Sequence, residues 1–562
     1  MRSAFLMLAV LSLCGIVHAG DNTPDVPLTH GVYRTLDRYD AHGWLDSAAS
    51  QTRPYTRLKV AGLLIHVLRN RDAQDAMSGT ERGILRRHLA SFRPEAARLG
   101  YAAPEAGTGA LERLAGALFS WRDSSASVAI EALFRQQLIL VRGEIREKET
   151  VSQTQIGAIV RGTLGDRLGF RARHFEAREW STLPRLTRAD VLARPIERVQ
   201  FKGKAVDFRE ATYQLVWATR WFDADAAKGS LDWGPGRSGN LLLAPFAPTF
   251  GMARFRTAYR RVRFIHILGF LEADSGLVDR SRTGFDNGHR RTFLRSKAIA
   301  AHRVEVDVSP RVRLGFQEAV IYGDRDFEFL YASPASVLTA AQMAVGDKDN
   351  LAVGLDISLR PVKRIQTYLA LFMDDLRKFS PGDFSNKLAT QAGVFWVDAF
   401  GLPDTDFRAE FVHIEPFVYS HRFNINAFTH FDALLGYPTG PNSDRVWVRL
   451  THRLSPSVSA AFGFERTRSG ENIDKSDGTL TNVGGDARRG RRPEDPAIRE
   501  FLSGTVEKRT QIGADLVFEP FSDFVLSSTY RLTRGSNVSI RGGKRGDGST
   551  NEWRMTLDLN FF

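Results

Sequence analysis

The chain ends with the stretch Asn551-Glu552-Trp553-Arg554-Met555-Thr556-Leu557-Asp558-Leu559-Asn560-Phe561-Phe562. Apolar side chains at the odd positions from Trp553 to Phe561 alternate with polar side chains at the even positions. Because successive side chains of a β-strand point to opposite faces, one face of this strand is apolar and the other is polar. Such a terminal strand is typical of a bacterial outer-membrane β-barrel, in which the last strand closes against the first. Phe562 lies one residue beyond the alternation.

The first residues predict export. Arg2 precedes an apolar run from Ala4 to Val17 that is too short for a permanent transmembrane helix, and Val17-His18-Ala19 is a small-residue cleavage site. We therefore expect residues 1–19 to be a cleaved signal peptide. Cys14 is the only cysteine and lies within this segment, so the mature chain is expected to have no disulfide and no cysteine metal ligand.

Composition limits the class of protein. The chain has 562 residues, of which 43% are hydrophobic and 25% are charged. After residue 19 it contains no apolar run of about 18 residues, which excludes helical membrane spans. A net charge of +13 favours anionic partners, namely lipopolysaccharide and outer-membrane lipid, or an anionic capsular or exopolysaccharide. Export makes nucleic acid an unexpected partner.

Residues 20–125 are predicted to form an α-helical periplasmic domain. Apolar residues recur at helical spacing in four stretches, which are Val32 to Tyr39, Leu58 to Leu68, Ile84 to Phe92 and Leu111 to Leu118. Ser78 with Glu81 forms a capping box before the third stretch. The run from Pro27 to Ala61 resembles one S-layer-homology unit, a wall-contacting module, so peptidoglycan or other export-machinery proteins are candidate partners. A helical domain that packs under the barrel is the simpler interpretation.

Residues 126–562 predict an all-β transmembrane antiparallel barrel of about 16–18 strands, because the hydrophobic period changes to two. For example, Val304, Val306 and Val308 alternate with charged residues. In a soluble β-sandwich the apolar faces would meet, whereas in a barrel they face lipid and the charged residues face the lumen. The export signal and the terminal strand favour the barrel and the cell outer membrane.

The order of turns and loops predicts one segment that is not a strand. Short turns of such barrels lie on the periplasmic side and long loops lie outside. Reading backward from the last strand predicts external loops at residues 272–297, 324–349, 375–386, 467–504 and 536–550. The short turns at residues 360–363 and 454–456 lie on the same side only if Arg422 to Leu435 is not a strand. We therefore expect residues 420–443 to be one external or lumen-filling segment.

A glycine-rich segment carries a family resemblance. Leu231-Asp232-Trp233-Gly234-Pro235-Gly236-Arg237-Ser238-Gly239-Asn240-Leu241-Leu242-Leu243-Ala244 is similar to the Trp-Gly-Pro-Gly and Leu-Leu-Leu-Ser signature of the capsule-assembly Wzi family of outer-membrane proteins. Ala244 stands where the family usually has Ser. Pro416 to His421 and Gly440 to Asp444 also resemble this family. The resemblance implies a barrel of about 18 strands with a periplasmic helical bundle. It also implies a lectin that helps to anchor or order capsular polysaccharide.

An acidic polysaccharide requires cationic groups for its carboxylates and flat aromatic faces for its sugar rings. The candidate polysaccharide-binding residues are Arg290, Arg291, Arg295, Arg488, Arg489, Arg491 and Arg492 in predicted loops, with Trp233, Arg237, Tyr368 and Phe372. Lipopolysaccharide neutralisation or solvation is the alternative for the arginines, and a girdle position is the alternative for Tyr368 and Phe372. The glycines around Trp233 favour an inward fold that shapes the lumen over ligand contact by Trp233 or Arg237.

The candidate residues of the 420–443 segment are Tyr419, His421, His430 and Asn442. If the two histidines meet in space, a structural hydrogen bond is favoured over a metal, because no clustered carboxylate accompanies them.

We expect no enzyme, no cofactor and no catalytic residue. Ser420 and His421 are neighbours, which gives no support for a catalytic triad. Asp374 and Asp375 would point to opposite faces of a strand. The alternative functions are a general or sugar-selective diffusion porin and, second, an outer-membrane hydrolase that acts on polysaccharide.

Overall fold

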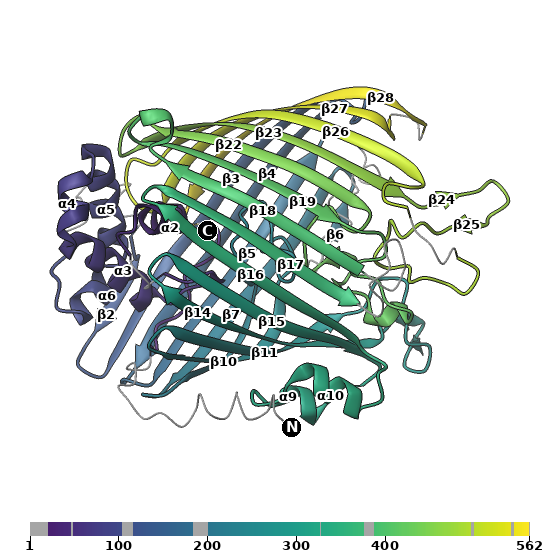
Figure 1. Ribbon diagram of the computed structural model, residues 1–562, viewed down its shortest axis with the longest axis horizontal. Helices are drawn as coiled ribbons and strands as arrows, with labels where there is room; N and C mark the ends of the chain where they lie inside the picture. The colour runs from purple at the N-terminus through teal and green to yellow at the C-terminus, as the bar shows by residue number, and fades with distance from the viewer. Residues whose placement is uncertain are drawn as a thin grey trace.

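The computed structural model describes residues 21–45, 49–103, 116–183, 200–325, 327–375, 387–495, 500–540 and 544–560. Eighteen antiparallel strands close into one barrel (Figure 1), which confirms the predicted fold class. The strands are β3 (Ala126–Gly143), β4 (Glu149–Leu164), β5 (Leu168–Ser181), β7 (Ala205–Ala218), β8 (Asp223–Gly229), β10 (Phe250–Tyr259), β11 (Val262–Glu272), β14 (Ser296–Ser309), β15 (Val312–Gly323), β16 (Asn350–Val362), β17 (Ile365–Asp375), β18 (Lys387–Val397), β19 (Thr405–Ile414), β22 (Ser443–Arg453), β23 (Val458–Glu471), β26 (Thr505–Phe518), β27 (Phe524–Ser539) and β28 (Arg545–Leu559). The expected signal peptide, Cys14, Phe561 and Phe562 lie outside the described residues.

The last strand closes the barrel against the first. β28 pairs with β3 from Thr550 opposite Gly143 to Leu559 opposite Phe134. Arg135 of β3 and Asp558 of β28 face the lumen and form an ion pair, whereas Trp553 lies exposed on the outer face. The alternation of the terminal stretch therefore separates lumen-facing from outward-facing side chains, as predicted.

The two ends of the barrel differ in their connections. At the short-turn end, links such as residues 165–167, 260–261 and 363–364 join successive strands. At the long-loop end, the connections 230–249, 273–295, 324–349, 415–442 and 472–504 are long. They contain β9 (Asp232–Trp233), β12 (Gly284–Asp286), β13 (His289–Arg291), α9 (Phe329–Ala332), α10 (Leu338–Ala344), η3 (Asn424–Asn426), β20 (Thr429–His430), β21 (Ala433–Leu434), β24 (Ile473–Asp474) and β25 (Leu480–Thr481). Because β19 pairs directly with β22, the prediction that Arg422 to Leu435 is not a barrel strand is confirmed, although Ser443 at the end of the predicted segment already belongs to β22.

The loop predicted at residues 536–550 is wrong in extent. β27 continues to Ser539 and β28 begins at Arg545, and the two strands stay paired across an irregularity between Gly535 and Val538. The sequence there is polar on both faces, so it lacks the alternation that marks the rest of these strands.

The N-terminal region is helical, as predicted, over most of its described length. Its helices are α2 (Val32–His42), α3 (Arg57–Arg69), α4 (Arg71–Ala76), α5 (Gly79–Ser91) and α6 (Arg93–Arg98). Ser78 and Glu81 form the expected capping box at the start of α5. No helix in the described ranges is long and apolar enough to cross a membrane.

The fourth predicted helical stretch is not confirmed. Leu111 and Leu114 lie outside the described residues, and Leu118 is not helical. It is followed by β2 (Phe119–Arg122), which pairs with β3. Phe119 and Trp121 alternate with polar residues, which is a strand period that the helical interpretation overlooked.

The N-terminal region closes the short-turn end of the barrel (Figure 1). Arg38 of α2 is buried and forms ion pairs with Glu81 of α5 and with Asp398 and Asp406 of the barrel. Burial and the nearby Arg38 guanidinium lower the pKa of His42 to about 3, although Glu81 and Asp398 lie 3.7 Å from its Nε2. His42 is therefore neutral at pH 7, and Arg38 is the cation at the centre of four carboxylates, the fourth being Asp404 at 3.9 Å.

Candidate functional site

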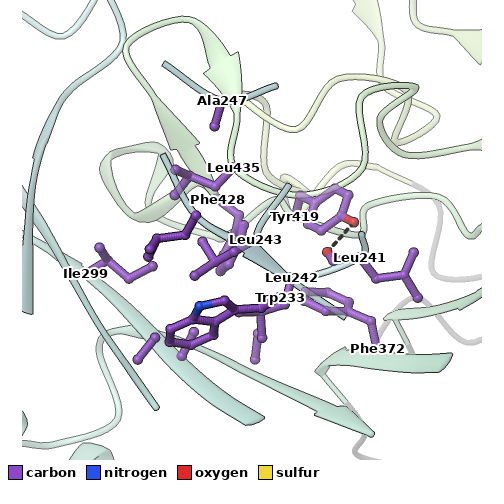
Figure 2. Packing of buried hydrophobic residues seen from close by; sticks show 14 of the residues in the cluster. Trp233, Leu241, Leu242, Leu243, Ala247, Ile299, Phe372, Tyr419, Phe428 and Leu435 are labelled. Carbon is purple, nitrogen blue, oxygen red and sulfur yellow. Dashed lines mark hydrogen bonds between the residues drawn. The ribbon is translucent and has the colours of Figure 1, made fainter. Parts of the chain in front are cut away.

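Two connections from the long-loop end turn inward and pack against each other in the lumen (Figure 2). We call residues 230–249 the first lumen segment and residues 415–442 the second lumen segment. Tyr419 joins them: its Oη donates a 2.6 Å hydrogen bond to the Leu241 carbonyl and accepts one of 3.1 Å from the backbone N–H of Tyr437. The backbone N–H of Ala244 donates to the Leu435 carbonyl at 2.8 Å.

Glycine is required where the two lumen segments approach each other. Gly239 has a φ of +141°, and a Cβ at this position would lie 2.9 Å from the Tyr437 ring. A side chain there would force the segments apart, and the backbone conformation itself disfavours other residues. The glycine-rich stretch around Trp233 is therefore an inward fold, as its sequence favoured.

The lumen segments form an apolar core with the barrel wall. Trp233, Phe372 and Phe428 have no exposed surface, and the ring centroids of Phe372 and Tyr419 are 5.1 Å apart. A fully buried ring has no face available to a sugar. The structure therefore corrects the assignment of Trp233 and Phe372 as polysaccharide-binding candidates, because their apolar bulk fills the lumen instead.

Arg237 connects the first lumen segment to the N-terminal region. Its Nε donates to Asp37 at 2.8 Å, and its backbone N–H donates to Glu410 at 2.9 Å. Burial alone would raise the pKa of Asp37, but the guanidinium groups of Arg237, Arg53 and Arg408 hold it well below its usual range. Arg237 thus belongs to an internal ion pair, which corrects its assignment as a polysaccharide-binding candidate.

The N-terminal region and the first lumen segment meet inside the barrel. β1 (Thr52–Arg53) pairs with β9, and the backbone N–H of Gly234 donates to the Gln51 carbonyl at 2.9 Å. A cavity of about 20 Å³ beside this junction is lined in part by Tyr368 and Gln51. It has room for about one water molecule. Tyr368 therefore lies inside the lumen, beside this cavity.

The lumen is filled unevenly. In the half formed by β10 to β19, the lumen-facing side chains of Arg254 and Arg303 are 3% and 0% exposed. In the half formed by β22 to β28, the lumen-facing side chains of Arg449, Arg509 and Arg554 are 30%, 47% and 42% exposed. These side chains are therefore buried by protein in one half of the lumen and are accessible to water in the other half.

The connection 273–295 presents aromatic and cationic side chains together. The hairpin of β12 and β13 places Phe285, which is 78% exposed, opposite Arg290. The Arg291 guanidinium lies 4.6 Å from the centroid of the Phe293 ring. Arg290 and Arg291 are exposed, and no ion pair with either is found within the described part of the chain.

An open groove of about 400 Å³ lies beside this hairpin in the same connection, and Arg280 and Arg295 are among its lining residues. Arg295 is ion-paired with Asp324, which also lines the groove. Arg295 is therefore at the long-loop end, as predicted. Its guanidinium is already paired with the Asp324 carboxylate of the same chain.

The four arginines predicted in the connection 472–504 also lie at the long-loop end, but they are held by neighbouring acidic residues. The contacts are Arg488 with Asp486 at 3.1 Å, Arg489 with Asp486 at 3.8 Å, Arg492 with Asp495 at 2.7 Å and Arg491 with the Asp495 carbonyl at 2.7 Å. Asp486 and Asp495 stand beside these arginines in the sequence and offset their charge. This cluster is a folded ion-pair network with exposed edges.

Residues 170–549 match the family model of the capsule assembly protein Wzi, which is more than half of the chain. The chain belongs to this family. Its fold is similar to that of Wzi, an outer-membrane protein involved in group 1 capsule assembly in Escherichia coli and a carbohydrate-binding β-barrel. The two share 11% identity with a TM-score of 0.51, over 96% of this chain and 99% of that chain.

Another solved outer-membrane protein resembles this chain less than Wzi does. The outer-membrane protein OprD of Pseudomonas aeruginosa has 11% identity and a TM-score of 0.43, over 79% of this chain and 95% of that chain. No curated protein sequence is significantly similar to the chain. As a Wzi-family protein, the chain is an outer-membrane β-barrel.

The two histidines of the second lumen segment bind different partners in this Wzi-family barrel. His430 accepts a 3.0 Å hydrogen bond at Nδ1 from the backbone N–H of Glu272, and His421 accepts one of 3.2 Å from the N–H of Phe423. Burial lowers the pKa of each histidine to about 4, so both are neutral at pH 7. Within the described ranges, no group of three His, Cys, Asp or Glu side chains is placed to hold a metal ion.

Asn442 fastens the second lumen segment to the connection 472–504. Its buried side chain donates to the carbonyls of Gly470 at 2.8 Å and Ser503 at 3.1 Å, and it accepts from the N–H of Leu502 at 2.7 Å. We expect Asn442→Ala to destabilise the docked connection by about 2 kcal/mol, because buried backbone groups lose their partners. Hydrogen–deuterium exchange of residues 472–495 should rise.

Asn287→Ala is the matched control for this variant. Asn287 also has a positive φ, but it lies exposed in the β12–β13 turn. The control therefore carries the backbone strain of the substitution without the loss of buried hydrogen bonds. Equal exchange of residues 472–495 in Asn442→Ala and the parent Wzi-family protein would contradict the fastening role.

Phe285 and Phe293 are the surface residues of this Wzi-family loop that sequence reasoning missed. A signal was present, because Asn287-Gly288 is a strong two-residue hairpin turn. This turn alone places Phe285 opposite Arg290, so the aromatic and the arginine belong to one hairpin.

Proposed function

We propose that this protein is an outer-membrane lectin that binds an acidic capsular or exopolysaccharide at its long-loop end and helps to assemble or attach it at the cell surface. The observation that carries the proposal is the β12–β13 hairpin, in which exposed Phe285 lies opposite Arg290 and next to Arg291. A sugar ring stacks on an exposed aromatic face, and a guanidinium binds a carboxylate. Membership in the Wzi family supports the same function.

The proposal also orients the barrel. Long loops of outer-membrane barrels lie outside the cell and short turns lie in the periplasm. The polysaccharide then meets the connection 273–295 outside, and lipopolysaccharide and outer-membrane lipid surround the wall. The N-terminal helices form the periplasmic domain, where peptidoglycan or export-machinery proteins are candidate partners.

A diffusion porin is the second candidate, and the water-accessible half of the lumen favours it. The exposed side chains of Arg449 and Arg509 line that half. The N-terminal helices at the short-turn end oppose this candidate, because they stand across the path. For a hydrolase the described residues offer little, since Glu410 already accepts internal hydrogen bonds from Ser238 and from the Arg237 N–H.

The test is binding of the purified barrel in detergent to the acidic surface polysaccharide of its own cells, titrated with salt. Saturable binding that weakens with salt is expected, because the arginines are exposed to screening. Arg290→Gln with Arg291→Gln should weaken binding about tenfold, since each exposed charge pair contributes about 0.5–1 kcal/mol. Phe285→Ala should weaken binding without changing its salt dependence.

Arg220→Gln with Arg311→Gln is the matched control, because these exposed arginines lie in turns at the short-turn end. It removes the same charge and should leave binding unchanged. An equal loss in both double variants would show non-specific attraction to net charge. No saturable binding, together with a steady open channel in planar bilayers, would favour the porin.

A further inference from the structure

The connection 324–349 lies against the outside of the barrel wall rather than over its mouth (Figure 1). Strand pairing places Ala300 of β14 and Val320 of β15 on the face opposite the lumen-facing Arg303. Tyr331 of α9 and Leu338 of α10 are fully buried in one apolar cluster with these two residues. The helices α9 and α10, which we call the lateral hairpin, thus cover part of the outward-facing wall.

A polar contact on the outward face of the wall fixes the lateral hairpin. Glu318 of β15 faces outward and accepts hydrogen bonds from the backbone N–H of Leu338 at 3.0 Å and from Thr339 Oγ1 at 2.6 Å. His302 of β14 lies opposite Glu318, with Nε2 3.0 Å from the carboxylate. A bare Glu318 on this face would be exposed to hydrocarbon, where an ionisable group is costly. The hairpin buries both side chains.

The outer surface of the lateral hairpin is apolar. Phe329 and Met343 are 74% and 69% exposed, and Phe327 and Leu330 are exposed as well. Residues 329–346 contain no charged side chain, whereas Glu328 precedes them and Asp347 follows them directly. A loop surrounded by water would not keep large apolar side chains outward over such a length.

The depth of the hairpin matches the outer half of a membrane. Glu318 lies five residues before Gly323, where β15 ends at the long-loop end (323 − 318 = 5). At about 3.3 Å per residue this is about 16 Å along a tilted strand. The apolar band of such barrels is about 25 Å tall. The hairpin surface is therefore continuous with the lipid-facing surface of the wall, which exposes Leu314 and Phe316 on the same strand.

We propose that the lateral hairpin is embedded in the membrane and that Phe329 and Met343 contact the acyl chains of the outer leaflet. The barrel then carries a lipid-binding surface built from helices beside its strands. This inference is independent of polysaccharide binding, since it concerns α9 and α10 on the outward face of the wall and not the β12–β13 hairpin.

Site-directed spin labelling tests this placement. The only cysteine, Cys14, lies in the expected signal peptide, so a chain produced without residues 1–19 accepts single labels at Phe329→Cys and Met343→Cys. The labelled proteins are placed in vesicles of phosphatidylcholine and phosphatidylglycerol, and collisions with oxygen and with a water-soluble nickel chelate are measured. Leu369→Cys on the outer face of β17 is the lipid control, and Phe285→Cys is the water control.

The expected result is that both hairpin labels behave like the Leu369 label, with high oxygen and low nickel accessibility. Either label showing the nickel accessibility of the Phe285 label would overturn the proposal, because the hairpin would then lie in water. A label shielded from both reagents would show a protein contact instead, and this outcome would also overturn it. The substituted side chains are exposed, so the fold does not depend on them.

Discussion

Replacing Arg38 with methionine is expected to release the N-terminal helices from the short-turn end of the barrel. The Arg38 guanidinium is buried among the carboxylates of Glu81, Asp398 and Asp406. Without it, these buried charges lose their central partner, and breaking a buried ion pair in this way costs about 3–5 kcal/mol. Methionine keeps most of the side-chain volume, so the loss arises from charge rather than from a cavity.

Hydrogen–deuterium exchange in detergent measures the release directly. In Arg38→Met, the helices α2 and α5 should exchange faster while the barrel strands stay protected. Arg86→Met is the control, because Arg86 lies exposed on α5, away from the carboxylate cluster. If protection of α2 were the same in Arg38→Met and in the control, the ion-pair cluster would not be what holds the region in place.

Trp233→Ala is expected to loosen the lumen core and to open a path through the filled half of the barrel. Trp233 is fully buried, and β9, which contains it, pairs with β1 of the N-terminal region. Truncating a buried tryptophan costs about 3–5 kcal/mol, because contacts are lost and a cavity remains. The cavity lies where the two lumen segments and the N-terminal region meet, so water gains access to their junction.

Single-channel conductance in planar bilayers and thermal unfolding report on this variant. Trp233→Ala should conduct more than the parent and unfold at a lower temperature, whereas Trp221→Ala, at an exposed position of the short-turn end, should do neither. Polysaccharide binding should change little, because the β12–β13 hairpin belongs to another connection and is exposed at the long-loop end. A large loss of binding with an intact fold would assign Trp233 to the ligand site after all.

Much of the fold can be predicted from local sequence. The period of two fixes which side chains of β28 face outward, and the period of helices with the Ser78 capping box defines α5. The absence of a barrel strand within residues 422–435 follows from counting turns, although the stretch is apolar. Apolar content alone does not distinguish a lipid-facing strand from a segment that is buried inside the lumen, and the pairing of β19 with β22 confirms what the turn count predicted.

The candidate site was less predictable, because it depends on which side chains meet. Arginines such as Arg295 and Arg492 were correctly placed at the long-loop end, but their partners Asp324 and Asp495 decide whether they are available to a ligand. Trp233 and Arg237 carry the family signature, yet one fills the core and the other holds Asp37. The lateral hairpin was predicted as an external loop, since nothing in a loop sequence alone says whether it turns over the mouth or down the wall.

The pairing of β1 with β9 has a consequence for how the chain is assembled. β1 comes from a region attached at one end of the barrel, and β9 comes from a connection that enters through the other end. Neither can reach its partner from outside once β28 has joined β3, except by passing along the lumen. Packing of the interior before or during the final zipping of the wall avoids this passage. Contacts between residues so distant in sequence are slow to form, which makes seam closure the step at which an exported chain is most exposed to misassembly.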